Sequence, residues 1–481
     1  MNYAMVLYVL GYICNVEALL MLLPLGVGLL YGESVGGTFG LTIVLLFAVG
    51  AVLTRKRPKK QTFYAKEGFV TVSLCWIVLS LFGALPLSLS GEVGSYIDCF
   101  FEIVSGFTTT GASVVENVEI LSQSILFWRS FTHWIGGMGV LVFVLMVLPM
   151  AGQSSIHLMR AESPGPIVGK FVPKLRSTAI LLYGIYMLLT VILIILLMLG
   201  GMSLFDSLIF SFGTAGTGGF ANYMASVGHF GSAYIDWVIT IFMILFGVNF
   251  NVYYLLFFGH FIQGLKNEEM RWYLGIIAVS TAIVTLNISH LYDSPLTALR
   301  YAAFQVATII STTGYATADF ALWPVLSHVV LLLLMIAGAC AGSTGGGIKT
   351  SRIIISVKSA WQELRHLIHP RTVTRVRLDG RPVEEETRST VGSFLTLYAL
   401  IVAFSVLLLS VEGYDFNTTF SAVLACFNNV GPGIGLVGPM GNYGFFTPFS
   451  KLLLSFDMLL GRLEIFPMLV LFSPSVWRKS R

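Results

Sequence analysis

Four short polar segments, each ending in glycine, are the parts of this chain whose residue types and spacing could bind an ion. Each segment follows an apolar, aromatic stretch of about two to three helical turns, and the glycines recur at intervals of 95 to 117 residues. Asp98 and Asp206 each stand 13 residues before the glycine of their segment. The segments are Thr108–Gly111, Gly216–Gly219, Ser311–Gly314 and Asn428–Gly431.

Backbone carbonyl groups give such segments their chemistry. A short helix that re-enters a membrane ends in unpaired carbonyls with partial negative charge. An extended turn at that depth is tolerated only inside protein or beside a water-filled cavity. Four such turns around one axis would form a ring of carbonyl oxygens, helped by Thr and Ser hydroxyls, that replaces the hydration shell of a monovalent cation. Glycine permits the left-handed backbone that turns carbonyls inward. Close helix packing through Gly and Thr is the alternative, and the fourfold recurrence favours a pore.

The composition indicates that these segments lie in a membrane. Of the 481 residues, 56% are hydrophobic and 11% are charged, whereas soluble chains carry about 25% charged residues. This excludes a soluble enzyme, a nucleic-acid-binding protein and a disordered chain. We expect an all-α polytopic protein with ten spans of about 20 residues, the first a retained helix and not a cleaved signal. The expected spans lie near residues 3–31, 37–54, 68–90, 127–149, 178–200, 235–259, 273–291, 325–348, 391–411 and 452–472.

The placement of charges supports this topology. If the N-terminus is cytoplasmic, most of the 28 Lys and Arg residues fall on the cytoplasmic side, as the positive-inside rule requires. Both termini are then predicted to be cytoplasmic. Acidic residues gather on the outer side, where they either form a vestibule that concentrates cations or have no such role.

Internal repetition is the strongest organisational signal in the chain. The unit of span, short helix, glycine turn and span occurs four times, after two additional N-terminal spans. We therefore expect four pseudo-symmetric pore repeats, the third including a gate loop and a cytoplasmic connection. The predicted boundaries are 1–60 for the N-terminal spans and 61–176, 177–272, 273–389 and 390–481 for the repeats.

The whole chain resembles the TrkH-like branch of the Trk/Ktr/HKT superfamily of potassium transporters, including the two N-terminal spans that the Ktr branch lacks. The resemblance lies in the glycine turns and in three further motifs. The matching stretches are Phe107–Ser113, Gly218–Phe220, Ser311–Tyr315, Cys426–Gly435, Ala339–Lys349, Gly461–Phe466 and Trp128–Gly139.

The resemblance implies four pore repeats in one chain and a homodimer with one pore per subunit. It implies uptake of K⁺ across the inner, cytoplasmic membrane, with K⁺ as the bound and transported ion and no covalent cofactor. It also implies cytosolic, nucleotide-binding regulator-of-conductance subunits, TrkA-like, as partners. The second segment contains four glycines, at 213, 216, 218 and 219, so its filter register is less certain than the others. The implied filter residues are Thr109, Thr110, Gly111, Gly218, Gly219, Thr313, Gly314, Val430 and Gly431.

Other functions stay open at this stage. The turns are not four copies of the TVGYG sequence of tetrameric potassium channels, so a Na⁺-coupled or poorly selective monovalent-cation transporter is the alternative. Two inverted halves would favour a symporter with broken helices, whereas four repeats in one orientation disfavour it. A membrane enzyme would need converging carboxylates, histidines or a metal. The eight histidines are scattered and the five cysteines form no CxxC pair, so we expect no enzyme, metal cluster or disulfide.

Residues 338–347 interrupt the eighth predicted span with five glycines, each of which costs a helix roughly 1 kcal/mol relative to alanine. The pore-obstructing intramembrane loop of the family falls on this stretch, and a flexible end of the span is the alternative. A phosphate-binding loop is disfavoured, because Ile348 separates Gly347 from Lys349. The predicted gate residues are Gly342, Ser343, Thr344, Gly345, Gly346, Gly347, Lys349 and Arg462.

Arg462 lies within the last predicted span, where a charge costs about 2.5–3.5 kcal/mol. A cation below the filter would repel K⁺ and could tether the gate loop. A structural ion pair, or a side chain that extends to the inner edge of the membrane, is the alternative. Residues 356–389, the longest cytoplasmic connection, either dock a cytosolic partner or form a solvated loop.

Overall fold

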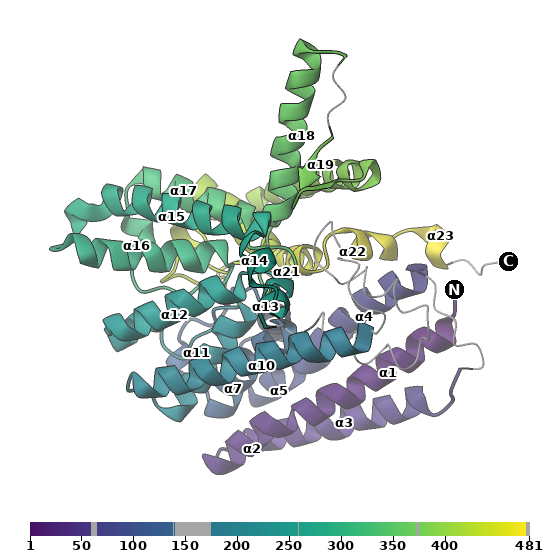
Figure 1. Ribbon diagram of the computed structural model, residues 1–481. Helices are drawn as coiled ribbons and strands as arrows, with labels where there is room; N and C mark the ends of the chain where they lie inside the picture. The colour runs from purple at the N-terminus through teal and green to yellow at the C-terminus, as the bar shows by residue number, and fades with distance from the viewer. Residues whose placement is uncertain (59–64, 138, 140–174, 258, 372–374, 478–481) are drawn as a thin grey trace.

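The computed structural model describes residues 1–58, 65–137, 139, 175–257, 259–371 and 375–477. These residues are helical apart from turns and one small hairpin, in which β1 (Arg377–Leu378) pairs antiparallel with β2 (Arg381–Pro382). Figure 1 shows a helical body from which α18 (Thr350–Ile368) projects. The hairpin follows α18 in the connection that the sequence predicts to be cytoplasmic, where no strand was expected.

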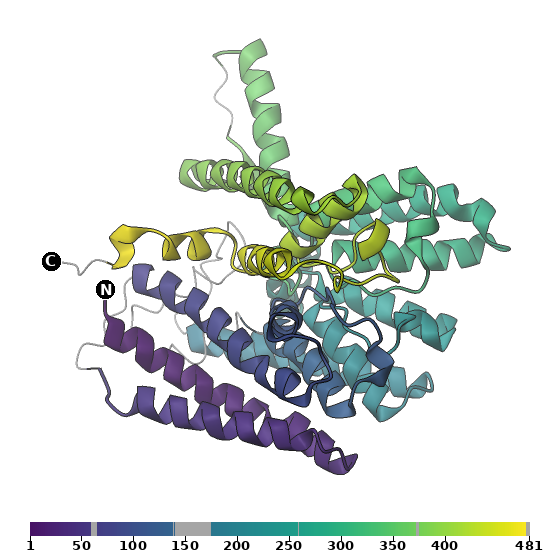
Figure 2. The same ribbon diagram turned by 180° about the vertical axis from the view of Figure 1, so that it is seen from behind.

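Two N-terminal helical segments pack side by side through small residues. α1 (Tyr3–Leu20) continues into α2 (Leu22–Leu30), and α3 (Gly36–Thr54) returns beside α1, as Figures 1 and 2 show. A methyl group on Gly50 would lie 2.1 Å from Asn15 Oδ1 and 2.8 Å from the Gly11 carbonyl oxygen. Small residues permit this approach, which membrane helices use for van der Waals packing.

Four groups of helices follow, each with a short buried helix after its first long helix. The first group is α4 (Ala65–Gly83), α5 (Leu85–Ser90), α6 (Tyr96–Phe107) and α7 (Gln123–Gly137). The second is α10 (Leu175–Leu199), α11 (Leu204–Gly216), α12 (Ala233–Phe246), α13 (Phe250–Phe257) and α14 (Phe261–Leu265). The third is α15 (Glu268–Ile288), α16 (Pro295–Ile310), α17 (Val325–Ala337) and α18. The fourth is α19 (Glu385–Leu409), α20 (Phe416–Phe427), α21 (Pro448–Arg462), α22 (Phe466–Leu471) and α23 (Pro474–Trp477).

Short 3-10 helices stand in the connections between these helices. They are η1 (Val118–Ile120), η3 (Ser226–Phe230), η4 (Ser289–Leu291), η5 (Phe320–Leu322), η6 (Ser410–Glu412) and η7 (Gly435–Val437).

In the part of the chain that the structure describes, membrane-length helices are fewer than the ten predicted spans, because several spans are broken and one lies partly outside this part. Among the described residues, six helical segments are long and apolar enough to cross a membrane, or seven if α12 and α13, bent by 91°, are one span. Three predicted spans correspond to the shorter helices α7, α17 and α21. α17 stops at Gly338 and α21 stops before Glu464 and Ile465, all of which have positive φ. Most of the inner half of the predicted span 127–149 lies outside the described residues.

Side-chain caps begin the short helices α6, α11, α16 and α20. The oxygen of each cap accepts a hydrogen bond from a backbone N–H of the first turn, which would otherwise have no partner. In α6, the Asp98 carboxylate accepts the Ser95 N–H at 2.9 Å and completes a capping box. The last six residues of all four helices are buried. The capping residues are Ser95, Ser203, Ser294 and Asp415.

The described ends of the chain lie side by side. The rings of Tyr3 and Trp477 stack with centroids 6.5 Å apart, and the Tyr3 hydroxyl donates to the Trp477 carbonyl. Figure 1 places both termini on the same side of the molecule. This arrangement agrees with an even number of membrane crossings.

Candidate ion site

The four short helices end in the same backbone turn. In each turn a residue other than glycine has a left-handed φ of 55° to 60°, and the glycine two positions later has a φ of 79° to 94°. A left-handed residue with a side chain costs roughly 1–2 kcal/mol, so the surrounding structure must hold these turns. The pairs are Thr109 and Gly111, Thr217 and Gly219, Thr312 and Gly314, and Asn429 and Gly431.

Two backbone hydrogen bonds fold each turn onto its own helix. In the first turn, the Thr109 N–H donates to Gly106 O at 3.1 Å and the Thr110 N–H donates to Ser105 O at 2.8 Å. The other three turns have the same two bonds, with N···O distances of 2.8 to 3.2 Å. This is the Schellman motif. In this motif the carbonyls of the residues just before the glycines accept neither of the two hydrogen bonds.

The four turns face one another in a closed ring. A methyl group placed on each glycine would overlap the carbonyl oxygen of the residue before the next glycine, and the fourth turn meets the first. The four turns therefore surround one axis, and their carbonyls lie at the contacts between neighbours. The methyl-to-oxygen distances are 2.0 Å for Gly111 with Gly218 O, 2.1 Å for Gly219 with Thr313 O, 2.1 Å for Gly314 with Val430 O and 2.6 Å for Gly431 with Thr110 O.

The backbone geometry fixes the register of the second turn, which the sequence left uncertain. Thr217 and Gly219 have the φ values of their counterparts in the other turns. Gly213 and Gly216 lie in α11, where a methyl group would sit 2.1 Å from the Tyr315 hydroxyl and 2.2 Å from the His133 carbonyl oxygen, respectively. Close packing therefore accounts for these two glycines.

All nine predicted filter residues lie in the four turns. Three residues that the sequence prediction of the filter did not include occupy, in the other turns, the left-handed position that Thr109 has in the first turn. The signal was present in the sequence, because each stands two positions before its glycine. The missed residues are Thr217, Thr312 and Asn429.

Side-chain hydrogen bonds link residues within single turns and, at one contact, join two turns. The hydroxyls of Thr108 and Thr110 lie 2.8 Å apart, and those of Ser311 and Thr313 are also 2.8 Å apart. At the contact between the fourth and first turns, Asn429 Nδ2 donates to Thr110 Oγ1 at 3.0 Å. These polar side chains of the tetrads therefore bond to one another.

A buried ion pair supports the first turn. The Arg129 guanidinium contacts the Glu102 carboxylate at 2.5 Å, and the two side chains are 1% and 0% exposed. Glu102 also accepts the Val114 N–H at 2.9 Å, while Arg129 lies 4.2 Å from the centre of the Phe220 ring. Removing one partner of a buried ion pair leaves an uncompensated buried charge and strongly destabilises a protein. The cluster therefore holds the segment after the first turn, at Val114, against the segment after the second turn, at Phe220.

His133 connects the same two turns. Its Nε2 accepts the Phe220 N–H at 3.2 Å, so its Nδ1 carries the proton and donates to Gly106 O at 2.8 Å. The geometry therefore specifies a neutral imidazole as a bridge. Arg129 and His133 lie in the motif Trp128–Gly139, whose sequence alone predicted no role for either residue.

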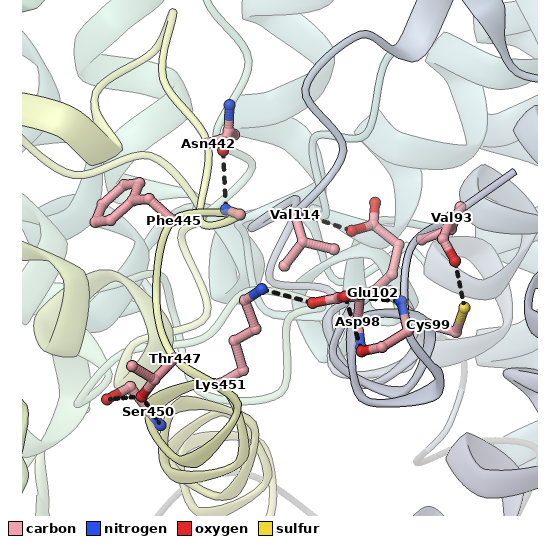
Figure 3. Close-up of polar contacts among 12 residues, drawn as sticks. Val93, Asp98, Cys99, Glu102, Val114, Asn442, Phe445, Thr447, Ser450 and Lys451 are labelled. Atoms are coloured by element: carbon pink, nitrogen blue, oxygen red, sulfur yellow. Dashed lines mark hydrogen bonds and ion pairs between the residues drawn. The ribbon is translucent and has the colours of Figure 1, made fainter.

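Figure 3 shows the contact between α21 and α6. Lys451 Nζ lies 2.6 Å from Asp98 Oδ1. Burial raises the pKa of Asp98, but the hydrogen bonds from Lys451 and Ser95 outweigh it, and the net pKa is lowered. The Glu412 carboxylate accepts the hydroxyls of Thr447 and Ser450.

Several of the acidic residues that the sequence predicts on the outer side have structural partners. Besides Asp98 and Glu102, Asp236 pairs with Arg300 at 3.3 Å, and Asp206 accepts Asn222 Nδ2 at 2.6 Å. These contacts favour a structural role over a cation-concentrating vestibule for these residues.

The interrupted span forms an intramembrane loop, residues 338–349, that touches the turns. The Gly346 N–H donates to Thr312 Oγ1 at 2.6 Å. A methyl group on Gly346 would lie 2.3 Å from Asn428 O, and one on Gly345 would lie 2.8 Å from Ser311 O. The loop therefore packs directly against the third and fourth turns.

The rest of the intramembrane loop contacts the bend between α12 and α13. Gly342 O accepts the Phe250 N–H at 3.1 Å, and Thr344 Oγ1 donates to Phe246 O at 3.3 Å. Ser343 Oγ donates within the loop to Cys340 O at 2.7 Å. A methyl group on Gly347 would lie 2.7 Å from the Cα of Gly338. Two broken spans thus fit against each other.

Two basic side chains reach the intramembrane loop. Lys349, which is 4% exposed, donates to Gly345 O. Arg462 donates through Nη1 to Thr344 O at 2.7 Å and to Thr109 Oγ1 at 3.2 Å, and through Nη2 to Gly136 O at 2.6 Å. Arg462 therefore joins the loop to the first turn. The two acidic residues near it bond elsewhere, Asp457 to Ser405 and Glu464 to Arg352.

A cavity of about 2030 Å³ borders the intramembrane loop and the start of α18. Ala341, Ser351 and Arg352 line it, together with Glu269 and residues of the hairpin. Gly345 and Gly346 contact the turns instead. The loop therefore stands between the turns and this cavity.

Groups suited to enzymatic metal chemistry are absent from the described ranges. These ranges contain no cluster of three or more His, Cys, Asp or Glu side chains that could hold a metal ion. None of the five cysteines forms a disulfide, and all five are buried.

These features define a polytopic, helical membrane protein built around a ring of carbonyl-bearing turns, a class whose members move ions. The chain belongs to the TrkH family of cation transport proteins, whose family model matches residues 37–479. This is a family of transporters rather than enzymes, so the predicted family and the prediction that the chain is not an enzyme are confirmed.

Relatives resemble the chain along its entire length. The Trk system potassium uptake protein TrkH of Salmonella typhimurium is 38% identical over 485 residues, covering 100% of both chains. The Trk system potassium uptake protein TrkG of Escherichia coli K12 is 36% identical, covering 98% of each. The crystal structure of the potassium transporter TrkH from Vibrio parahaemolyticus matches with a TM-score of 0.90 and 34% identity, over 99% of this chain and 100% of that one.

Proposed function

We propose that this protein takes up K⁺ across the cytoplasmic membrane through the ring of four glycine turns. The observation that carries the proposal is the closure of the ring, in which each glycine leaves room for the carbonyl of the next turn. Carbonyl rings of this kind replace the hydration shell of a monovalent cation. The relatives named as potassium uptake proteins supply the identity of the ion.

The turns give the four-repeat organisation its functional meaning. We infer that each repeat contributes one carbonyl to a single site, from Thr110, Gly218, Thr313 and Val430. The shared Schellman turn and the cyclic order of contacts support this inference.

Serine substitution of the ring glycines tests the proposal. Gly111→Ser and Gly314→Ser place atoms where the Gly218 and Val430 carbonyls lie. We expect both variants to fail to complement a K⁺-uptake-deficient strain at low K⁺. The matched control is Gly184→Ser, because a methyl group on Gly184 meets nothing within 4 Å. Full growth of both ring variants with unchanged ion preference would contradict the proposal.

Flux measurements separate K⁺ uptake from the alternative transporter. Uptake of ⁸⁶Rb⁺ into proteoliposomes, with Na⁺ and choline as competitors, should be slowed by excess K⁺ far more than by excess Na⁺. Equal competition by Na⁺ would indicate a poorly selective monovalent-cation transporter. A requirement for Na⁺ on the side from which Rb⁺ enters would indicate coupling.

We also propose that the intramembrane loop obstructs the path between the ring and the cavity. Its packing against the third and fourth turns supports this role, as does the bond from Arg462 to Thr344 O. Deletion of residues 342–346 should shorten the obstacle and raise flux measured without a regulator. A deletion variant that inserts normally and conducts no more than the unmodified protein would contradict this.

The assembly follows from the proposed activity. We propose a homodimer in the inner membrane, with both termini cytoplasmic and with TrkA-like nucleotide-binding subunits on that side. The projecting helix α18 and the hairpin after it are the proposed docking elements. Loss of regulator binding on deletion of 356–368, in protein that still forms dimers, is the expected result. Retained binding would place the docking site elsewhere.

A further inference from the structure

One buried carboxylate bonds near both ends of the intramembrane loop, at Ala341 inside it and at Ser351 two residues after it. Glu269, in the first turn of α15, accepts the Ala341 N–H at 2.7 Å and the Ser351 N–H at 3.0 Å through the same oxygen, Oε1. Glu269 is 5% exposed. Every predicted gate residue except Arg462 lies between Ala341 and Ser351, so one side chain spans the base of the loop.

The two preceding residues tie the same helical turn to the hairpin. The Glu268 N–H donates to Asp379 Oδ1 at 2.6 Å, and Asn267 Nδ2 donates to Asp379 Oδ2 at 3.0 Å. The Glu268 side chain pairs with Lys358 of α18, whose Nζ also donates to Arg377 O at 2.8 Å. The first turn of α15 therefore bonds to the loop on one side and to α18 and the hairpin on the other.

We propose that Glu269 is a positioning residue that clamps both ends of the intramembrane loop, so that displacement of the hairpin passes through the first turn of α15 to the loop. This inference rests on the proposed function, and it identifies how the loop is held and from where it is released.

The chemistry of the contact suits a clamp. A carboxylate that accepts backbone N–H groups forms charge-assisted hydrogen bonds, roughly twice as strong as neutral ones. Removal of the Glu269 carboxylate leaves the buried Ala341 and Ser351 N–H groups without this acceptor. An unpaired buried donor is costly, so a displaced loop in which these groups find other acceptors becomes more favourable. Glutamine at this position keeps an accepting oxygen but loses the charge, so it should weaken the clamp without abolishing it.

The loop carries its own probe for displacement. Cys340 is 0% exposed, and its N–H donates to Gly247 O at 3.1 Å. A thiol reagent in solution should therefore reach Cys340 slowly while the loop is clamped. The other four cysteines are buried as well, and Cys340→Ser identifies the part of the signal that comes from the loop.

The experiment measures Cys340 labelling by a small methanethiosulfonate reagent in purified full-length protein without regulator, together with ⁸⁶Rb⁺ flux in proteoliposomes. We expect Glu269→Ala to raise the labelling rate about tenfold, equivalent to 1.36 kcal/mol, and to raise flux. Glu269→Gln should give a smaller increase in both. The control is Glu386→Ala, which removes an exposed carboxylate from the wall of the same cavity away from the loop. It should change neither rate.

Each outcome decides one part of the inference. Unchanged labelling in a well-inserted Glu269→Gln or Glu269→Ala protein overturns the clamp. Equal increases in Glu269→Gln and Glu386→Ala would show an effect of cavity charge and would also overturn it. Asp379→Ala removes the hairpin bonds and should raise labelling less than Glu269→Ala does, so no increase overturns the coupling to the hairpin. If labelling changes as expected while no variant and no unmodified protein conducts Rb⁺, the clamp stands and the proposed transport function fails.

Discussion

The glycine turns and the intramembrane loop are both irregular backbone within the helical bundle, yet they are held in different ways. Each turn satisfies its backbone through bonds to its own helix, as with Thr109 to Gly106 O and Thr110 to Ser105 O. The loop bonds to other elements, through backbone contacts to Gly247 and Phe250 and through the side chains of Glu269, Arg462 and Thr312.

This difference allows one chain to combine a fixed element with a neighbouring element that can move. Irregular backbone in a membrane needs partners wherever it stands. Bonds within one helix break only if the helix unfolds, whereas a side-chain contact to another element breaks when the two elements separate. The turns are therefore suited to hold a constant ring, and the loop is suited to move.

The largest expected effect comes from filling the ring. Gly219→Ala places a methyl group 2.1 Å from Thr313 O, so the ring must widen. We expect ⁸⁶Rb⁺ flux to fall by roughly a hundredfold, or about 2.7 kcal/mol of added barrier. Gly431→Ala, with 2.6 Å to Thr110 O, should lose less. A larger loss for Gly431→Ala than for Gly219→Ala would contradict the contact order.

Arg462 gives the next largest effect, in the opposite direction. Arg462→Ala removes a positive charge beside the first turn and the bond to Thr344 O. We expect flux without regulator to rise by about tenfold. Arg462→Lys keeps the charge but loses the planar set of donors. Flux equal to that of the unmodified protein would assign the barrier to the charge. Flux equal to that of Arg462→Ala would assign it to the hydrogen bonds that tether the loop. Unchanged flux in a well-inserted alanine variant would reduce Arg462 to a structural role.

A smaller effect separates two equivalent threonines. Thr312→Val removes the hydroxyl that accepts the Gly346 N–H, and we expect flux to rise by about threefold, near 0.7 kcal/mol. Thr217→Val is the matched control, because the Thr217 hydroxyl donates to Gly216 O within its own turn. Equal flux in the two variants would show that the loop gains nothing from Thr312.

The smallest effect concerns the outer ion pair. The pKa of Asp98 is lower in the folded protein than its unfolded value of about 3.9. The pair of Asp98 with Lys451 therefore stabilises the fold fully at a pH above the unfolded pKa. This contribution is lost as the pH falls through the lower pKa of the folded state. Lys451→Met should lower the midpoint of thermal unfolding at pH 7 by a few degrees. The loss should shrink as the pH falls below 4. A loss independent of pH would assign the effect to packing.

The sequence predicted the ring residues because a local pattern repeats. Four glycines at corresponding positions mark the turns, and the capping residues at the helix starts explain the spacing of Asp98 and Asp206 from them. The register of the second turn needed the backbone angles of Thr217 and Gly219, because neighbouring glycines in the same stretch serve close packing.

The contacts of the intramembrane loop could not be predicted in the same way. Glu269 lies 72 residues before Ala341 along the chain, and Thr312 lies 34 residues before Gly346. No periodicity links such pairs, since they meet only through the packing of whole helices. The number of membrane-length helices also depended on breaks, such as the one at Gly338, which a hydropathy pattern averages over.

Anomalous diffraction from crystals of the protein grown in Rb⁺ tests the central claim, that the four turns form one ion site. The account predicts an anomalous peak on the axis of the ring, within ligand distance of the Thr110, Gly218, Thr313 and Val430 carbonyl oxygens, and its loss in Gly219→Ala. A ring without a peak, in crystals that show Rb⁺ bound elsewhere along the chain, would contradict it.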